Sequence, residues 1–267
     1  MAEKFESKRL TTFKTGEKAL DGTIEVIVEE PLSIRVSGKP YVVVMRTPGE
    51  ELYLCAGFCF TEGLVDSPDD IKELGFCTEE GTNVATVTLT SERQEKIAGL
   101  LERKGFVSQT SCGICGKELV GDLKKMLSPI KETFTISAGR VMSLVDRFPK
   151  RQALNKKTRG AHAAMLFNAD AELLCMAEDV GRHNSLDKAI GMAMMNRRLE
   201  AVVMGVVSSR LSYELVQKAG RAGIEVLVGL SRPTTLAVEM AEAVNMTLVC
   251  VQSGTLMVFA NRSRILN

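Results

Sequence analysis

Two cysteines at a close spacing are the clearest chemical feature of this chain. Cys112 and Cys115 stand in a run rich in glycine, serine and threonine, with Gly113 and Gly116 beside them. Thiols at this spacing can touch, so one can attack while the other resolves or relays. The run from Lys117 is typical of a helix start, whose dipole favours the thiolate form. The pair could serve as a redox dithiol, as half of a zinc site or as a persulfide carrier.

The surrounding sequence disfavours two of these three uses. A structural zinc site takes about four ligands, usually with a second close pair of cysteines or histidines. His162 and His183 stand far apart in sequence, so zinc is the weaker interpretation and no structural metal is expected. A thioredoxin-like pair follows the first strand of a βαβ unit, whereas this pair comes late, in a glycine-rich loop. A pair of unreactive loop thiols is the remaining alternative.

The other five of the seven cysteines have no comparable surroundings. Cys55 and Cys59 share one helical face with apolar neighbours, which predicts core packing. Cys77, Cys175 and Cys250 have no cysteine near them in sequence, and the same interpretation is favoured for them. An odd number of cysteines in a chain that starts without an apolar signal core argues against a disulfide scaffold. We therefore expect a cytoplasmic protein.

Composition excludes several broad classes of partner. Apolar residues make up 45% of the chain and charged residues 25%, which is typical of a globular protein. The net charge of +1 argues against non-specific electrostatic binding to nucleic acid. No apolar run is long enough to span a membrane. One basic stretch fits a solvated face and would also suit an acidic partner or cofactor. It contains Lys150, Arg151, Lys156, Lys157 and Arg159.

The first part of the chain predicts a mixture of strands and helices. Short apolar or alternating runs predict a meander of strands at residues 23–28, 32–37 and 41–46, a helix after Gly49, a strand at 84–89 and a charged helix at 91–103. We expect an α+β N-terminal portion over residues 1–110 and a Cys loop with a linking helix over residues 111–130.

The remaining residues, 131–267, predict an α/β domain. Apolar strand runs alternate there with helical patterns that begin after Asn184, Ser209 and Pro233. The strand runs are residues 163–167, 173–177, 201–207, 224–230 and 246–251. Strands that are apolar throughout and separated by helices imply a largely parallel sheet covered on both faces.

Three strand-to-helix junctions in this domain predict a ligand site. Residues 177–184, 207–210 and 230–234 each bring an arginine and short hydroxyl or amide side chains to a helix start. In an open parallel sheet, ligands bind beyond the carboxyl ends of the strands, where helix N-termini favour anions such as phosphate. Serine and asparagine also cap helices for structural reasons, so one junction alone is weak. Three junctions at one edge favour an anion pocket.

Titratable residues at the first junction extend this prediction. His162 taken alone would pack beside the strand that follows it. His183 is different because it stands at a helix N-terminus next to Arg182, where it can donate a hydrogen bond to an anion. Glu178 and Asp179 could pair with the edge of a guanine base or could form a salt bridge with Arg182.

Taken together, these motifs resemble the formate dehydrogenase accessory sulfurtransferase family. The resemblance covers nearly the full length of the chain, and six motifs in the right order are highly specific. The matching stretches are EPLSI at 30–34, MRTPG at 45–49, SCGICG at 111–116, EDVGRHN at 178–184 with LDK at 186–188, SSR at 208–210 and PT at 233–234.

The resemblance implies a sulfurtransferase with a three-layer, deaminase-like α/β/α core. Members of the family take persulfide sulfur from a cysteine desulfurase and pass it to a molybdenum or tungsten bis-guanine-dinucleotide cofactor that then enters formate dehydrogenase. For this chain it implies molybdenum bis(molybdopterin guanine dinucleotide) as bound substrate, and a homodimer. Deaminase activity is not implied, because that chemistry needs a His-x-Glu with a Pro-Cys-x-x-Cys to hold zinc. Here His162 is followed by two alanines, and Ser111 precedes Cys112.

Carried over residue by residue, the resemblance implies that Cys112 carries the persulfide and that Cys115 assists in its transfer. The anion pocket and the resemblance together predict the residues that contact the cofactor. These are His162, Asp179, Arg182, His183, Asn184, Ser208, Ser209, Arg210, Ser231, Val251, Gln252, Ser253, Gly254, Thr255 and Leu256. The chain departs from the family pattern at Arg159, at Arg232 and at residues 250–254, which lack an expected glycine and arginine.

Two other classes of function remain open at this point. A cofactor-binding chaperone would shelter the cofactor and dock partner enzymes without moving sulfur. A thiol–disulfide oxidoreductase would cycle a disulfide between Cys112 and Cys115.

Overall fold

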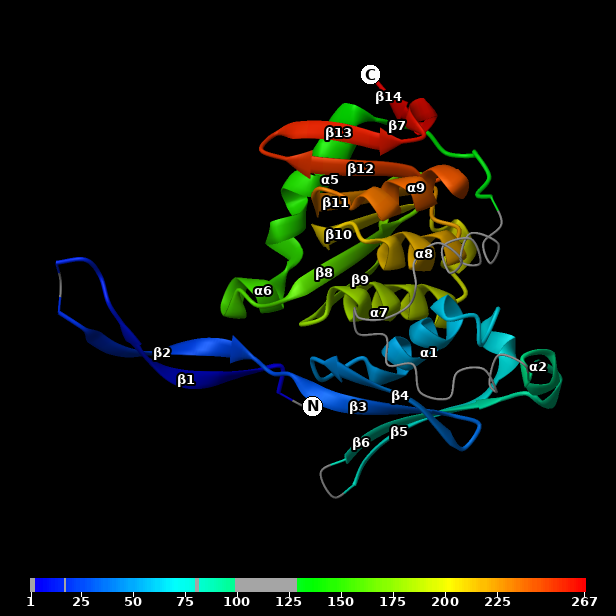
Figure 1. Cartoon of the computed structure of the whole chain (residues 1–267), viewed down its shortest axis with the longest axis horizontal. Coiled ribbons are helices and arrows are strands. Elements are labelled where there is room, and N and C mark those ends of the chain that lie inside the picture. Colours follow the sequence, from blue (N-terminus) through cyan, green and yellow to red (C-terminus); the bar gives the residue numbers. More distant parts are fainter. Residues whose placement is uncertain (1–2, 17, 80–81, 99–128) are drawn as a thin grey trace.

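The computed structural model describes residues 3–16, 18–79, 82–98 and 129–267 (Figure 1). Cys112 and Cys115 lie outside these residues, as do residues 111–128 of the predicted Cys loop and linking helix. No helix in the described ranges has the length and apolar character needed to cross a bilayer.

The N-terminal portion contains an antiparallel ribbon and a four-stranded sheet. Strands β1 (Phe5–Thr12) and β2 (Leu20–Ile27) pair only with each other in the described chain and project from the rest of the molecule (Figure 1). The sheet has the order β4-β3-β6-β5. Its strands are β3 (Glu30–Val36), β4 (Lys39–Arg46), β5 (Ile71–Glu79) and β6 (Thr82–Leu89).

This arrangement corrects the predicted meander. The three predicted strands exist as β2, β3 and β4, but β2 pairs with β1, and β3 pairs with β6 in parallel. The sequence gives no clear signal for β1, because most of its positions are polar and exposed on both faces of the ribbon. Helix α1 (Glu51–Thr61) is present as predicted and packs against the four-stranded sheet, and α2 (Ser91–Lys96) follows β6.

The C-terminal portion is built on a six-stranded sheet with the order β13-β12-β11-β10-β8-β9. Its strands are β8 (His162–Phe167), β9 (Leu173–Asp179), β10 (Met204–Arg210), β11 (Val226–Ser231), β12 (Thr247–Gln252) and β13 (Thr255–Ala260). Only β10–β11 and β11–β12 are parallel pairs. The prediction of a largely parallel sheet is therefore wrong, because β8–β9 and β12–β13 are hairpins with turns too short for a crossover.

Helices cover both faces of this sheet. On one face lie α7 (Arg182–Met195), α8 (Tyr213–Arg221) and α9 (Thr235–Ala243), and on the other lies α5 (Ala138–Arg151), followed by α6 (Ala153–Thr158) (Figure 1). The short strands β7 (Ile136–Ser137) and β14 (Ile265–Leu266) pair beside α5. Helix α5 was not predicted, although its buried residues Val141, Leu144, Val145 and Phe148 follow the helical period.

Two glycines allow a helix of the N-terminal portion to pack closely against a helix of the C-terminal portion. Helices α1 and α7 cross at Gly57 and Gly191 with almost no space between their backbones. A Cβ atom on Gly57 would lie 2.7 Å from the carbonyl carbon of Asp187, and one on Gly191 would lie 2.7 Å from the nitrogen of Gly57. Neither glycine has a positive φ, so close approach of the two backbones explains them.

A buried ion pair lies beside this crossing. Lys218 of α8 donates to Asp187 of α7 and to Thr61 of α1, at 2.9 Å in each case. Burial lowers the pKa of Lys218, but the carboxylates of Asp187 and Glu62 outweigh it, so that the pKa is raised and the side chain stays charged. The charged groups therefore hold the three helices in one arrangement.

We expect Gly57→Ala to destabilise the protein by roughly 3 kcal/mol, because the added methyl group forces α1 and α7 apart. Denaturant unfolding measures the change. The matched control is Gly139→Ala in α5, where nothing lies within 4 Å of the added Cβ and stability should hold or rise by up to about 1 kcal/mol. Equal stability of the Gly57→Ala variant and the parent would contradict the tight crossing.

Candidate functional site

The three predicted junctions meet at one edge of the six-stranded sheet. Strands β9, β10, β11 and β12 point the same way, so their carboxyl ends share this edge. His162, at the start of β8, pairs in register with Asp179, and Arg210 pairs with Ser231. The turn between β12 and β13 lies at the same edge. We refer to this end of the sheet as the carboxyl edge.

Asp179 is an internal residue of this edge. Its side chain is 0% exposed and accepts hydrogen bonds from the backbone of Thr47 (3.1 Å) and Gly181 (2.8 Å), from Asn184 Nδ2 (3.0 Å), and from Lys188 Nζ (2.8 Å). Both carboxylate oxygens are thus occupied by the chain itself. This differs from the predicted contact with a base edge or with Arg182, and makes Asp179 the residue that orders the turn.

Glu178 and Asn184 also bind within the chain. Glu178 accepts hydrogen bonds from the backbone nitrogens of Leu154 and Asn155, both at 2.9 Å, and so caps the start of α6. Asn184 Nδ2 donates to the carbonyl oxygen of Met45 at 2.7 Å. The predicted motif of residues 178–184 is therefore largely a framework that connects β4, α6 and α7.

His183 lies at the first turn of α7 and is half-buried. Its Nε2 lies 2.7 Å from a carboxylate oxygen of Glu214 in α8 and 3.4 Å from the hydroxyl of Ser212. The hydrogen bond with His183 lowers the pKa of Glu214 below its ordinary value. The sequence analysis missed Glu214 and Ser212. Their signal is a serine at the N-cap of a helix followed by an acidic residue in its first turn.

His162 is the second histidine of the carboxyl edge. Its Nδ1 lies 3.2 Å from the hydroxyl of Ser208, which also accepts from the backbone of Ala163 at 2.9 Å. Burial lowers the pKa of His162, and the nearby charges of Arg182 and His183 lower it further. The Nε of Arg182 is buried and has no hydrogen-bond partner in the described part of the chain. This cluster therefore offers positive charge and N–H donors.

The remaining predicted residues differ in exposure. Arg210 is exposed and Ser231 half-buried, whereas Ser209 is buried and donates to the carbonyl of Arg210. Val251 belongs to the core. Ser253 and Gly254 have φ values of 51° and 73°, as a two-residue hairpin turn requires, and with Gln252 and Thr255 they form an exposed tip. Leu256 is half-buried.

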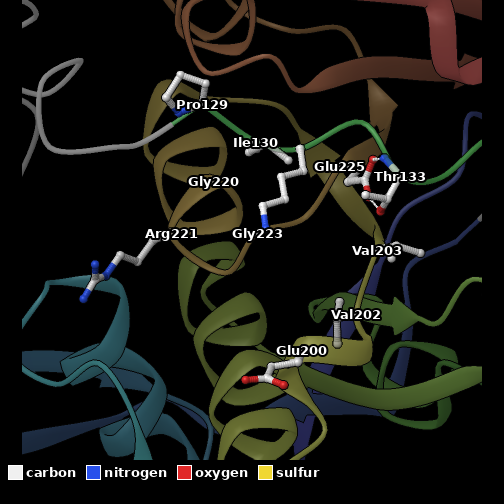
Figure 2. A pocket seen from close by; sticks show the side chains of 11 residues that line it. Pro129, Ile130, Thr133, Glu200, Val202, Val203, Gly220, Arg221, Gly223 and Glu225 are labelled. Atoms are coloured by element: carbon white, nitrogen blue, oxygen red, sulfur yellow. Dashed lines mark hydrogen bonds between the residues drawn. The ribbon is translucent and has the colours of Figure 1, made fainter.

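A cavity of about 400 Å³ lies at the opposite edge of the sheet, where β10 and β11 begin (Figure 2). Its lining includes Pro129, Val203, Arg221 and Glu225, and contains none of the predicted site residues. Glu225 is buried and binds Arg264 at 2.9 Å as well as the backbone of Thr133. These contacts hold the segment from Pro129 to Thr133 against the start of β11.

The described cysteines differ sharply in accessibility. Cys55, Cys59, Cys175 and Cys250 are buried, which confirms the predicted core packing of Cys55 and Cys59. Hydrogen bonding with Cys55 and burial raise the pKa of Cys59, and burial raises the pKa of Cys175 and Cys250. Cys77 is exposed on β5, so the core packing predicted for it is wrong, whereas that predicted for Cys175 and Cys250 is confirmed. Within the described ranges, no three His, Cys, Asp or Glu side chains form a cluster that could hold a metal ion.

The sequence and the fold both match known proteins. A family model described as the FdhD/NarQ family matches residues 27–266, so the chain belongs to that family. A protein from Mycolicibacterium paratuberculosis named sulfur carrier protein FdhD is 37% identical, over 97% of this chain and 98% of its own length. A protein of the same name from Sulfolobus acidocaldarius is also 37% identical, over 90% of each chain.

The fold is also found in a solved structure. A crystal structure from Desulfotalea psychrophila, described as that of a formate dehydrogenase accessory protein, superimposes with a TM-score of 0.78. The match covers 99% of this chain and 100% of that one, at 22% sequence identity. This similarity identifies the fold of the whole chain.

The two histidines provide a direct test of the carboxyl edge. We expect the imidazole of His162 to titrate below the ordinary value for a histidine, because burial and the neighbouring cations disfavour its charged form and lower its pKa. NMR of the imidazole groups measures the midpoint, and the signal lost in His162→Gln but kept in His183→Gln assigns it. A midpoint for that signal at or above the ordinary value would contradict the described surroundings of His162.

Proposed function

We propose that this protein is a sulfurtransferase that carries sulfur as a persulfide on Cys112 and delivers it to a bound molybdenum bis(molybdopterin guanine dinucleotide) cofactor. The observation that carries the proposal is the full-length similarity to relatives named sulfur carrier proteins. The Cys112-Gly-Ile-Cys115 motif resembles the one that carries sulfur in this family. Of the described cysteines four are buried, and buried thiols are poor acceptors.

Loading requires a donor with a persulfide, for which a cysteine desulfurase is the proposed partner. The thiolate of Cys112 attacks the terminal sulfur of the donor persulfide. A new S–S bond forms at Cys112, the S–S bond of the donor breaks, and the donor cysteine leaves as a thiolate. The exchange needs no external oxidant or reductant, because one S–S bond replaces another.

Delivery to the metal as sulfide requires two electrons, which Cys115 can supply. Its thiolate attacks the inner sulfur of the Cys112 persulfide, so that the terminal sulfur leaves as sulfide and a Cys112–Cys115 disulfide remains. A cellular dithiol reductant then restores both thiols. This step gives the second cysteine of the pair a defined chemical role.

The carboxyl edge is the proposed binding site for the anionic part of the cofactor. Arg182, His183 and His162 gather there, and the buried Nε of Arg182 has no acceptor within the described residues. Backbone N–H groups at the start of α7 add further donors for phosphate. Arg210, Ser231 and the exposed tip at residues 252–255 surround them.

Several finer features belong to the same proposal. The recipient of the sulfur-loaded cofactor is formate dehydrogenase, and the protein acts as a homodimer in the cytoplasm, where thiols stay reduced. The six-stranded sheet with its helices on both faces is taken to be deaminase-like, without deaminase chemistry.

The decisive experiment incubates the protein with a cysteine desulfurase and free cysteine and then maps added sulfur by mass spectrometry. We expect one added sulfur atom on Cys112, none in Cys112→Ala, and a persistent persulfide in Cys115→Ala because release is blocked.

Cys77→Ala is the matched control, since Cys77 is an exposed thiol outside the motif. It should load like the parent. Sulfur found only on cysteines other than Cys112 would refute the assignment to Cys112. Active formate dehydrogenase in cells that carry Cys112→Ala would favour a cofactor chaperone instead.

A further inference from the structure

Helices α5 and α6 carry a local excess of positive charge. Asp146 is the one acidic residue in segment 138–160, whereas the whole chain has a net charge of only +1. We name six of the seven exposed cations of this segment the basic face: Arg140, Arg147, Lys150, Arg151, Lys156 and Arg159. Lys157 adds a seventh charge, 4.2 Å above the ring of Phe5.

The fold does not need this charge. Helix α5 buries Val141, Leu144 and Phe148 against the sheet, so its cations point away from the core. Within the described part of the chain, no carboxylate forms an ion pair with any residue of the basic face. Arg147 and Arg151 lie one helical turn apart and repel each other, and Arg140 in the first turn opposes the helix dipole. These two arrangements cost stability, whereas Lys150 and Lys156 lie in the last turns of their helices, where positive charge suits the helix dipole. The unfavourable placement of the arginines points to a role outside folding.

The basic face adjoins the carboxyl edge. Helix α6 ends two residues before Gly160–Ala161 lead into His162 at the start of β8, and Glu178 caps the first turn of α6 from the end of β9. Figure 1 shows α6 beside the start of β8. A partner that covers the basic face would therefore sit next to the site proposed for the cofactor.

The composition of the face favours one class of partner. Phe148 is the one aromatic residue in segment 138–160 and is buried, so no exposed ring is available to stack on nucleic-acid bases. None of the large exposed apolar side chains of the described chain lies in this segment, although the β1–β2 ribbon, whose strand β2 contacts α6, exposes Phe13, Leu20, Ile24 and Val26. The basic face itself therefore presents charge without apolar or aromatic groups, which suits an acidic protein surface.

We infer that the basic face docks an acidic surface of the apoenzyme that receives the sulfur-loaded cofactor. The inference rests on the proposed function, since it assumes cargo that must be handed over at the adjoining edge. Complementary charge accelerates encounter and fixes orientation, so that the recipient meets the carboxyl edge.

The test reverses charge on the face and measures association with apo-formate dehydrogenase from the same source. The variant is Arg147→Glu/Lys150→Glu/Arg151→Glu. Its association rate should fall at least about 10-fold at low salt, and the salt dependence seen with the parent should largely disappear. The control is Arg35→Glu/Lys39→Glu/Lys72→Glu, which changes net charge equally on exposed residues of the N-terminal sheet and should associate nearly like the parent.

Two further measurements separate the outcomes. Denaturant unfolding and persulfide loading of Cys112 should be unchanged in both variants. Failure of the parent to load sulfur would contradict the proposed function, whereas normal loading with unaltered docking of the reversed variant would overturn the inference. Equal loss in the control, no binding of the parent to the apoenzyme, or tighter binding of the parent to duplex DNA or anionic vesicles would overturn it as well.

Discussion

A fully buried ion pair between Asp179 and Lys188 supports the rest of the candidate site. Both side chains are 0% exposed, and the Nζ of Lys188 lies 2.8 Å from the carboxylate. Taking two charges out of water costs several kcal/mol per ion unless hydrogen bonds complete their shells. Here Thr47 supplies bonds to both partners: its backbone nitrogen donates to Asp179 and its carbonyl accepts from Lys188 at 2.9 Å. The pair therefore requires three segments to meet.

Those three segments come from both halves of the molecule. Thr47 follows β4 of the N-terminal sheet, Asp179 ends β9, and Lys188 lies in α7. The hydroxyl of Thr47 also accepts from the backbone of Val180 at 3.0 Å. The tight crossing at Gly57 and Gly191 brings α1 against α7, so that this network can close. Arg182 and His183 are then held at the start of α7, and the N-terminal portion becomes a structural part of the edge.

The sequence predicted features that depend on local pattern. The burial of Cys55 and Cys59 followed from helical spacing, and the junctions before Arg182, Arg210 and Arg232 followed from apolar runs next to helix starts. All three junctions do share one edge. Each junction lies where a strand ends and a helix begins, and the three strands run in the same direction. The antiparallel neighbours of β10 and β12 were missed because apolar runs look alike in parallel and antiparallel sheets.

The roles of residues in the site were harder to predict than their positions. Asp179 and Asn184 were expected to face a ligand, but their partners Thr47 and Met45 lie more than a hundred residues earlier in the chain. Such long-range contacts leave no periodic signal. Glu214 could not be predicted for the same reason. It is a candidate site residue only because its carboxylate lies close to the Nε2 of His183. The chemistry of Cys112 and Cys115 stays a prediction, because both lie outside the described residues.

A double-mutant cycle on Asp179 and Lys188 tests the central claim most directly. Denaturant unfolding would compare Asp179→Asn, Lys188→Met and the double variant with the parent. Lys188→Met leaves the buried carboxylate of Asp179 without its cation, and Asp179→Asn leaves Lys188 with only the more distant carboxylate of Glu50, at 3.7 Å. Each single change should cost roughly 3–5 kcal/mol, and the double variant should lose about 2 kcal/mol less than the sum of the two. Additive losses, within about 0.5 kcal/mol, would show that the two charges do not act as one unit and would contradict this account.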